Sequence, residues 1–130
     1  MQDESAAHGA TEGAKLTFVL PIRPGQSEPY RRFLQELKAS RRVDFEAACR
    51  RWGLGSVAIW LAQGRGGDLA VIQLRLAADL ADAAERFALS QRPFDLWIKE
   101  RMRELHGVDP NSFIRYRAEL LEVWQDLDPV

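Results

Sequence analysis

Few residues in this chain have the type and spacing that chemistry requires, and Arg41 is the clearest of them. It lies in the apolar stripe of a predicted helix, in steps of four from Phe33 and Leu37. A guanidinium cannot lose its charge, so a buried Arg41 needs a carboxylate or an anionic ligand. Asp44, three residues further on, could supply that carboxylate within the helix. Both alternatives stay open, and the same alternatives apply to Arg101 in a later helix.

Other candidates for acid–base or nucleophilic chemistry have no recognisable partner. His106 precedes Gly107 at a predicted helix end, where the macrodipole favours a protonated imidazole, but no residue is identified that would orient it as a general base or haem ligand. Cys49 is the only cysteine and is expected to pack as a small apolar group. No Cys/His pair has the spacing of a metal site. We therefore expect no metal and no cofactor.

Composition excludes several functional classes. With 46% hydrophobic and 28% charged residues, the chain belongs with ordinary globular domains and not with disordered ones. A net charge of −1 argues against a nucleic-acid-binding protein, which normally carries a basic surface. No run of about 18 apolar residues predicts a membrane span, and the acidic N-terminus is no secretory signal. A single cysteine excludes an intramolecular disulfide, so we expect a cytoplasmic protein.

The elements that must position these residues begin after residues 1–14, which carry no large apolar side chain and are expected to form a tail. Residues 15–130 are expected to form a single domain. Alternating apolar residues over 16–22 predict a strand. Ser27 is a plausible N-cap of a long helix that ends at Gly53, and a break near Ser40 is an alternative to an unbroken helix.

A hairpin follows, with strands over 56–62 and 68–76 joined by a glycine-rich loop. Asp79 can cap a helix that ends near Ser90, and Pro93 can begin a further helix that stops at Gly107. Residues 119–125 are ambiguous between helix and strand, and the fold logic favours a closing fourth strand. The order βαββαβ, with an extra helix before the last strand, predicts an α+β ferredoxin-like domain with its helices on one face of the sheet.

The opposite face of that sheet must then be covered by a partner subunit, a ligand, or both. From the last strand it takes either Glu122 and Trp124 or Leu121 and Val123, because a one-residue shift in register exchanges the two sets. The face is either a filled dimer interface or one wall of a ligand pocket. The earlier strands contribute Thr17, Val19, Ala58, Trp60, Ala62, Val71, Gln73 and Arg75. The residues predicted to bind a ligand are Arg41, Trp60, Gln73, Arg75 and Trp124.

A set of local motifs resembles a family of small uncharacterised bacterial proteins in the dimeric α/β-barrel superfamily. The motifs are Leu20-Pro21-Ile22-Arg23-Pro24-Gly25, Phe33-Leu34-Gln35-Glu36-Leu37, Arg41-Arg42, the hairpin, and Pro93-Phe94-Asp95-Leu96-Trp97-Ile98-Lys99-Glu100. The resemblance implies a homodimer in which two ferredoxin-like sheets pack face to face. It further implies a small-molecule-binding protein or a cofactor-independent enzyme. The alternative is a non-catalytic dimerisation or accessory module whose interface is filled, and the resemblance does not decide whether the chain is an enzyme.

Overall fold

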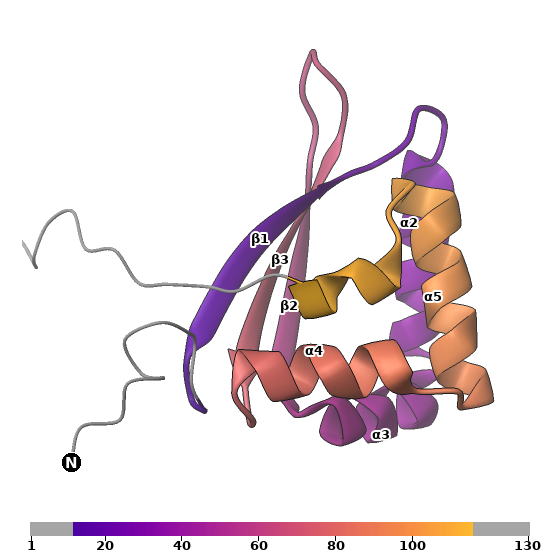
Figure 1. Cartoon of the computed structure of the whole chain (residues 1–130). Helices are drawn as coiled ribbons and strands as arrows, with labels where there is room; N and C mark the ends of the chain where they lie inside the picture. Colours follow the sequence, from indigo (N-terminus) through magenta and orange to yellow (C-terminus); the bar gives the residue numbers. More distant parts are fainter. Residues whose placement is uncertain (1–11, 116–130) are drawn as a thin grey trace, which may run out of the picture.

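The computed structural model describes residues 12–115. Within this range the chain forms an α+β fold in which one antiparallel sheet is covered on one side by a layer of four helices (Figure 1). None of the helices in residues 12–115 has both the length and the apolar character that crossing a membrane requires. The elements are β1 (Lys15–Pro21), α2 (Ser27–Lys38), α3 (Arg42–Trp52), β2 (Leu54–Ala62), β3 (Leu69–Leu76), α4 (Leu80–Leu89), α5 (Pro93–His106) and the short 3₁₀ helix η1 (Pro110–Arg115).

The sheet has the strand order β1-β3-β2, and both pairs are antiparallel. β3 therefore lies between β1 and β2, the two strands that the helices α2 and α3 connect. This split arrangement is consistent with a ferredoxin-like sheet. The segment 119–125, predicted to be a fourth strand, lies outside the described residues. In residues 12–115, β1 pairs with a strand on one edge only.

The long helix predicted between β1 and β2 is broken, and the break near Ser40 is confirmed. α2 ends at Lys38 and α3 begins at Arg42, so residues 39–41 form a turn in which the Arg41 amide donates to the Glu36 carbonyl over 2.8 Å. The prediction that Ser27 caps the helix is wrong. Its hydroxyl instead donates to Asp68 Oδ2 over 2.5 Å and ties the start of α2 to the hairpin.

A glycine allows α3 to turn directly into β2. Gly53 adopts a left-handed conformation with φ of 84°, which favours glycine. A Cβ at this position would lie 2.7 Å from Ala78 Cβ, a distance that carbon atoms do not tolerate. The Gly53 carbonyl also accepts from the Ala77 amide over 2.7 Å. Gly53 therefore joins α3 to the end of β3 as well as to β2.

The two helices after the hairpin begin and end as predicted. Asp79 Oδ1 accepts a hydrogen bond from the Asp82 amide over 2.8 Å and so caps α4. Pro93 is the first residue of α5, and Gly107 ends it in a left-handed conformation. The extra helix expected before the last strand is thus present.

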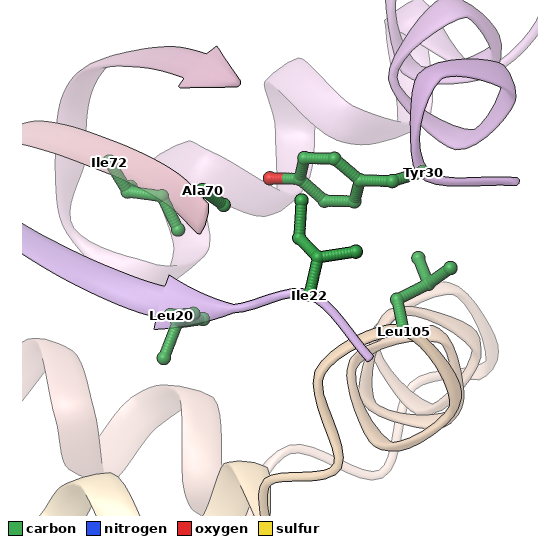
Figure 2. Packing of buried hydrophobic residues seen from close by; sticks show 6 residues of the cluster. All are labelled: Leu20, Ile22, Tyr30, Ala70, Ile72 and Leu105. Atoms are coloured by element: carbon green, nitrogen blue, oxygen red, sulfur yellow. The ribbon is translucent and has the colours of Figure 1, made fainter. Parts of the chain in front are cut away.

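The hydrophobic core lies between the sheet and the helices and has two centres. Figure 2 shows the first, in which the Tyr30 ring of α2 lies over Ile22 and points towards Ala70 and Ile72 of β3. Leu20 of β1 and Leu105 of α5 complete this centre. The second centre joins α2, α3, α4 and α5 through Leu37, Ala48, Trp52, Phe87 and Ile98.

Candidate functional site

The face of the sheet away from the helices carries most of the predicted ligand-binding residues. The register aligns Val19 with Val71 and Val71 with Trp60 across the three strands, and it aligns Gln73 with Thr17 and Ala58. No helix of the described chain covers this side of the sheet (Figure 1). We call this surface the open face. It consists of Lys15, Thr17, Val19 and Pro21 of β1, Ser56, Ala58, Trp60 and Ala62 of β2, and Leu69, Val71, Gln73 and Arg75 of β3.

The open face is apolar and exposed from its middle to the end formed by Pro21, Leu69 and Ala62. Trp60 keeps 54% of its surface accessible, and Val19 and Leu69 are also among the exposed large hydrophobic residues of the described chain. Single exposed apolar residues are ordinary, but these three lie in two adjacent rows of one sheet. Trp60, Val19 and Leu69 therefore form an exposed apolar cluster on one side of the sheet.

One end of the open face is basic. Lys15 and Arg75 are directly opposite each other on β1 and β3, and neither forms an ion pair within residues 12–115. Two cations without an acidic partner among residues 12–115 give this end of the face a positive potential. Arg75 was predicted as a site residue but Lys15 was not, because its place opposite Arg75 follows only from the strand register.

A β-bulge in β2 leaves room for the Arg75 guanidinium. Leu54 pairs with Leu76 and Ser56 pairs with Arg75, so Gly55 is the extra residue of the bulge. The guanidinium lies against Gly55 so closely that a Cβ there would come within 2.6 Å of Cζ, Nη1 and Nη2. Glycine at position 55 is therefore what allows Arg75 to lie across the end of β2.

Arg41, also predicted to bind a ligand, lies elsewhere. The turn at 39–41 removes it from the helical stripe, and its Cζ lies 4.1 Å from the centroid of the Trp97 ring and 5.6 Å from that of Phe94. Arg41 and Asp44 form no ion pair, so that alternative is not realised, and aromatic faces of α5 stabilise the charge instead. Arg101 does pair with an acid, Glu104, one turn along its helix. Trp124 lies outside the described residues.

A buried polar cluster centred on Asp95 joins the helices and was not predicted from the sequence. This carboxylate is 0% exposed and lies in the first turn of α5. It accepts from Arg51 Nη2 over 2.5 Å, from Trp52 Nε1 over 3.1 Å and from Ser90 Oγ over 2.5 Å. The three donors come from α3 and from the turn after α4. Asp95 is thus a structural link between three helices, because its oxygens are occupied by protein donors.

Lys99, one turn after Asp95, closes the end of α4. Its Nζ donates to the carbonyl oxygens of Ala88 and Ser90 over 2.9 and 3.2 Å, and it lies 5.3 Å from the centroid of the Phe87 ring. Burial lowers the pKa of Lys99 from its ordinary value, while nearby Asp95 raises it. The motif 93–100 that supports the family resemblance therefore has structural roles here, in Asp95, Trp97 and Lys99.

His106 and Cys49 are poorly placed for catalysis. His106 Nδ1 lies 2.8 Å from the Pro21 carbonyl oxygen, which can only accept, so Nδ1 carries the proton. The ring packs edge-on against Tyr30, with centroids 5.1 Å apart. Burial raises the pKa of the Cys49 thiol to about 11, which disfavours the thiolate that a nucleophile needs. The described chain also contains no group of three His, Cys, Asp or Glu side chains that could hold a metal ion.

The environment of His106 predicts a pH-dependent stability. Burial lowers the pKa of His106 below its ordinary value of 6.5, and the hydrogen bond to Pro21 opposes this only in part. As the pH falls, the unfolded chain therefore binds this proton before the folded chain does. The stability that the neutral His106 imidazole contributes is fully present above pH 6.5 and falls as the pH drops below that value. We expect urea denaturation between pH 7.5 and 5 to show this loss in the wild type. His106→Asn keeps a donor for Pro21 and should flatten the profile between pH 6.5 and 5; an unchanged profile would contradict the assignment.

Residues 12–115 therefore present an exposed face with an apolar part and a basic end, and no recognisable catalytic pair occurs among them. Trp60, Gln73 and Arg75 lie together on the open face, whereas Arg41 lies in the helical layer. Comparison with protein-family models, with curated protein sequences and with solved structures finds no match to this chain.

Proposed function

We propose that this chain is a homodimeric small-molecule-binding protein of the dimeric α/β-barrel type, in which the open face packs against a second copy. We further propose that its ligand is a small organic anion bound at Lys15 and Arg75. The observation that carries the proposal is the combination of an exposed apolar surface with two adjacent cations that have no acidic partner in residues 12–115. Because no catalytic pair is evident among residues 12–115, binding is the function the geometry supports best.

The size of the open face supports a role for the segment 119–125 in the dimer. Eight residues at ~3.3 Å each and three strands spaced ~4.8 Å apart give a flat area of roughly 380 Å². A stable interface usually buries about 800 Å² on each partner. A fourth strand beside β1 would widen the face by about a third, and it would protect an edge strand that otherwise invites aggregation. We therefore propose that residues 119–125 complete the sheet at β1.

Charge favours one orientation of the two copies. Suppose that two open faces stack with β1 of one copy running in the same direction as β1 of the other. The Lys15–Arg75 end of one copy would then meet the same end of its partner, and four cations would repel one another. With β1 of one copy running opposite to β1 of the other, each basic end meets the partner's apolar end, which Pro21, Leu69 and Ala62 form. We propose the antiparallel arrangement, which leaves two equivalent anion sites in each dimer.

Replacing Trp60 should weaken the dimer. It is the largest exposed side chain of the open face, and aromatic anchors of this kind commonly contribute 2 kcal/mol or more to an interface. We expect Trp60→Ala to raise the dimer dissociation constant by about 30-fold or more, as measured by sedimentation velocity over a concentration series. The matched control is Val43→Ala on α3, where an apolar side chain 79% exposed lies off the open face. Equal dissociation constants for Trp60→Ala and the wild type would contradict the interface.

Native mass spectrometry under gentle conditions tests the ligand. We expect a dimer with extra bound mass, and we expect Arg75→Gln to lose that mass. The control Arg65→Gln removes the same charge from the exposed hairpin loop and should keep it. A dimer without extra mass in any sample would favour the accessory module with a filled interface. A monomer would contradict the barrel.

A further inference from the structure

A second candidate binding site lies on the helical side of the sheet, at the outer edge of β2. A groove of about 560 Å³ runs between the end of α2, one face of α3 and the first half of β2. Its size falls within the range of small-molecule sites, about 300–1,000 Å³. At the outer edge of β2 the groove also includes Gly55 and Ser56, so it adjoins the end of the open face where Arg75 lies. Its apolar floor and its charged rim belong to the helical side of the sheet and are not shared with the open face.

The floor of the groove is apolar and only partly covered. Leu37 is buried, whereas Phe45, Cys49, Leu54 and Val57 are each half-buried although they pack against the two core centres. These five side chains present a continuous strip from α2 across α3 to β2. A strip of this kind gains stability when an apolar chain replaces water.

The rim of the groove carries more positive than negative charge. Lys38, Arg42 and Arg50 line it, against a single acid, Glu46. Arg42 Nε donates to Glu46 Oε2 over 3.1 Å, so that carboxylate is already paired. Lys38 and Arg50 form no ion pair within residues 12–115 and are available to a ligand.

We infer that this groove binds an amphipathic monoanion, namely a medium-chain carboxylate whose hydrocarbon tail lies on the apolar floor and whose head lies near Lys38 and Arg50. Charge complementarity selects the anion, because the rim has a net charge of +2. The apolar floor selects the tail, and each methylene it buries raises affinity up to about fourfold.

Cys49 supplies a direct readout, because it is the only cysteine in the chain and lies in the floor of the groove. The probe is sodium decanoate, and the observable is the rate at which iodoacetamide alkylates Cys49 at pH 9, followed by mass spectrometry. We expect saturating decanoate to slow alkylation at least tenfold. We expect the midpoint concentration to fall as the probe lengthens from hexanoate to decanoate. Unchanged alkylation by decanoate would overturn the inference.

Charge variants test the head-group contact. The double variant Lys38→Gln/Arg50→Gln should raise the decanoate dissociation constant about tenfold in titration calorimetry. The control Arg32→Gln/Arg65→Gln removes the same charge from exposed residues outside the groove and should leave the constant within twofold. Equal weakening in both pairs, or equal affinity for decanoate and 1-decanol, would show that the rim does not recognise the anion and would overturn the inference.

Filling the floor tests the tail contact. Cys49→Phe should abolish decanoate binding, because the larger side chain occupies the groove. Circular dichroism checks that this variant folds. If it does not fold, Cys49→Leu fills the groove with a smaller side chain and tests the same contact. Cys49→Ser keeps the groove open and should bind decanoate as the wild type does. Undiminished binding to a folded, filled variant would overturn the inference. The proposed function is tested separately through dimerisation, so each of the two proposals can fail without the other.

Discussion

Replacing Asp95 with alanine is expected to lower the free energy of unfolding by about 3–4 kcal/mol. Asp95 is fully buried and accepts hydrogen bonds from Arg51, Trp52 and Ser90. Without it, the buried indole N–H of Trp52 and the Ser90 hydroxyl lose their acceptor, and Arg51 loses its counter-charge. Since the free energy of unfolding of natural domains is about 5–15 kcal/mol, this loss is a large share of the total stability.

Urea denaturation at pH 7 measures this effect, and two variants separate its causes. Asp95→Asn keeps the volume but loses the charge and one acceptor, so we expect it to cost about 1–3 kcal/mol. Asp44→Ala removes an acid from the first turn of α3, where the side chain is exposed, and should cost less than about 1 kcal/mol. A cost for Asp95→Ala no greater than that for Asp44→Ala would contradict the structural role of the cluster.

A double-mutant cycle shows how much of the effect belongs to the ion pair. Arg51 retains about 30% of its side-chain exposure, so part of its charge is screened by water. Arg51→Ala alone should therefore cost less than Asp95→Ala. The free-energy costs of the two single variants should sum to more than the cost of the double variant, because each single change removes the same contact.

Local patterns in the sequence predict much of the fold. The alternation over 16–22 identifies β1 and its buried side, and the glycine-rich loop identifies the hairpin. The ends of the later helices follow from residue type: Asp79 caps α4, Pro93 begins α5 and Gly107 ends it, as predicted. Trp60, Gln73 and Arg75 share a face because side chains alternate along a strand. These features depend on residues close in sequence, so they can be inferred from it.

Contacts between distant residues could not be inferred in the same way. Ser27 has the chemistry of an N-cap, but its hydroxyl binds Asp68, 41 residues away. The sequence offers Asp44 as a partner for Arg41 within one helix, yet the Arg41 charge lies over Trp97 of α5. In both cases a tertiary partner competes successfully with the local one.

The buried side of α5 shows how an apolar pattern can mislead. The apolar residues Ile98 and Leu105 of α5 are buried, as an apolar stripe predicts, but the buried positions also include Asp95, Lys99 and His106. Charged residues are rarely buried, so an apolar pattern passes over them. The i,i+4 spacing of Asp95 and Lys99, in line with Ile98, was the available signal. It gains meaning only once the donors on α3 and the carbonyls of α4 are known.

The second large effect is expected at Tyr30, whose ring fills the first core centre (Figure 2). The side chain is 1% exposed and contacts the sheet, α5 and the His106 ring. Tyr30→Ala should cost about 3–5 kcal/mol in urea denaturation, because it loses apolar burial and leaves a cavity. Tyr30→Phe keeps the ring and should stay within about 1 kcal/mol of the wild type at pH 7, since no hydrogen bond of the Tyr30 hydroxyl occurs in residues 12–115.

Alkaline pH distinguishes the hydroxyl from the ring. Burial raises the pKa of Tyr30 to about 12 from its ordinary value of 10, so the unfolded chain ionises first as the pH rises. The stability due to the neutral phenol is complete below pH 10 and is lost as the pH approaches 12. We expect the wild type to lose stability relative to Tyr30→Phe between pH 10 and 11.5, by about 1.4 kcal/mol per pH unit at most. Lysine titration affects both proteins alike, so the difference between them reports Tyr30 alone. A constant difference across this range would mean that the phenol is reached by water in the native protein, and Tyr30 would then not be the sealed centre of the core.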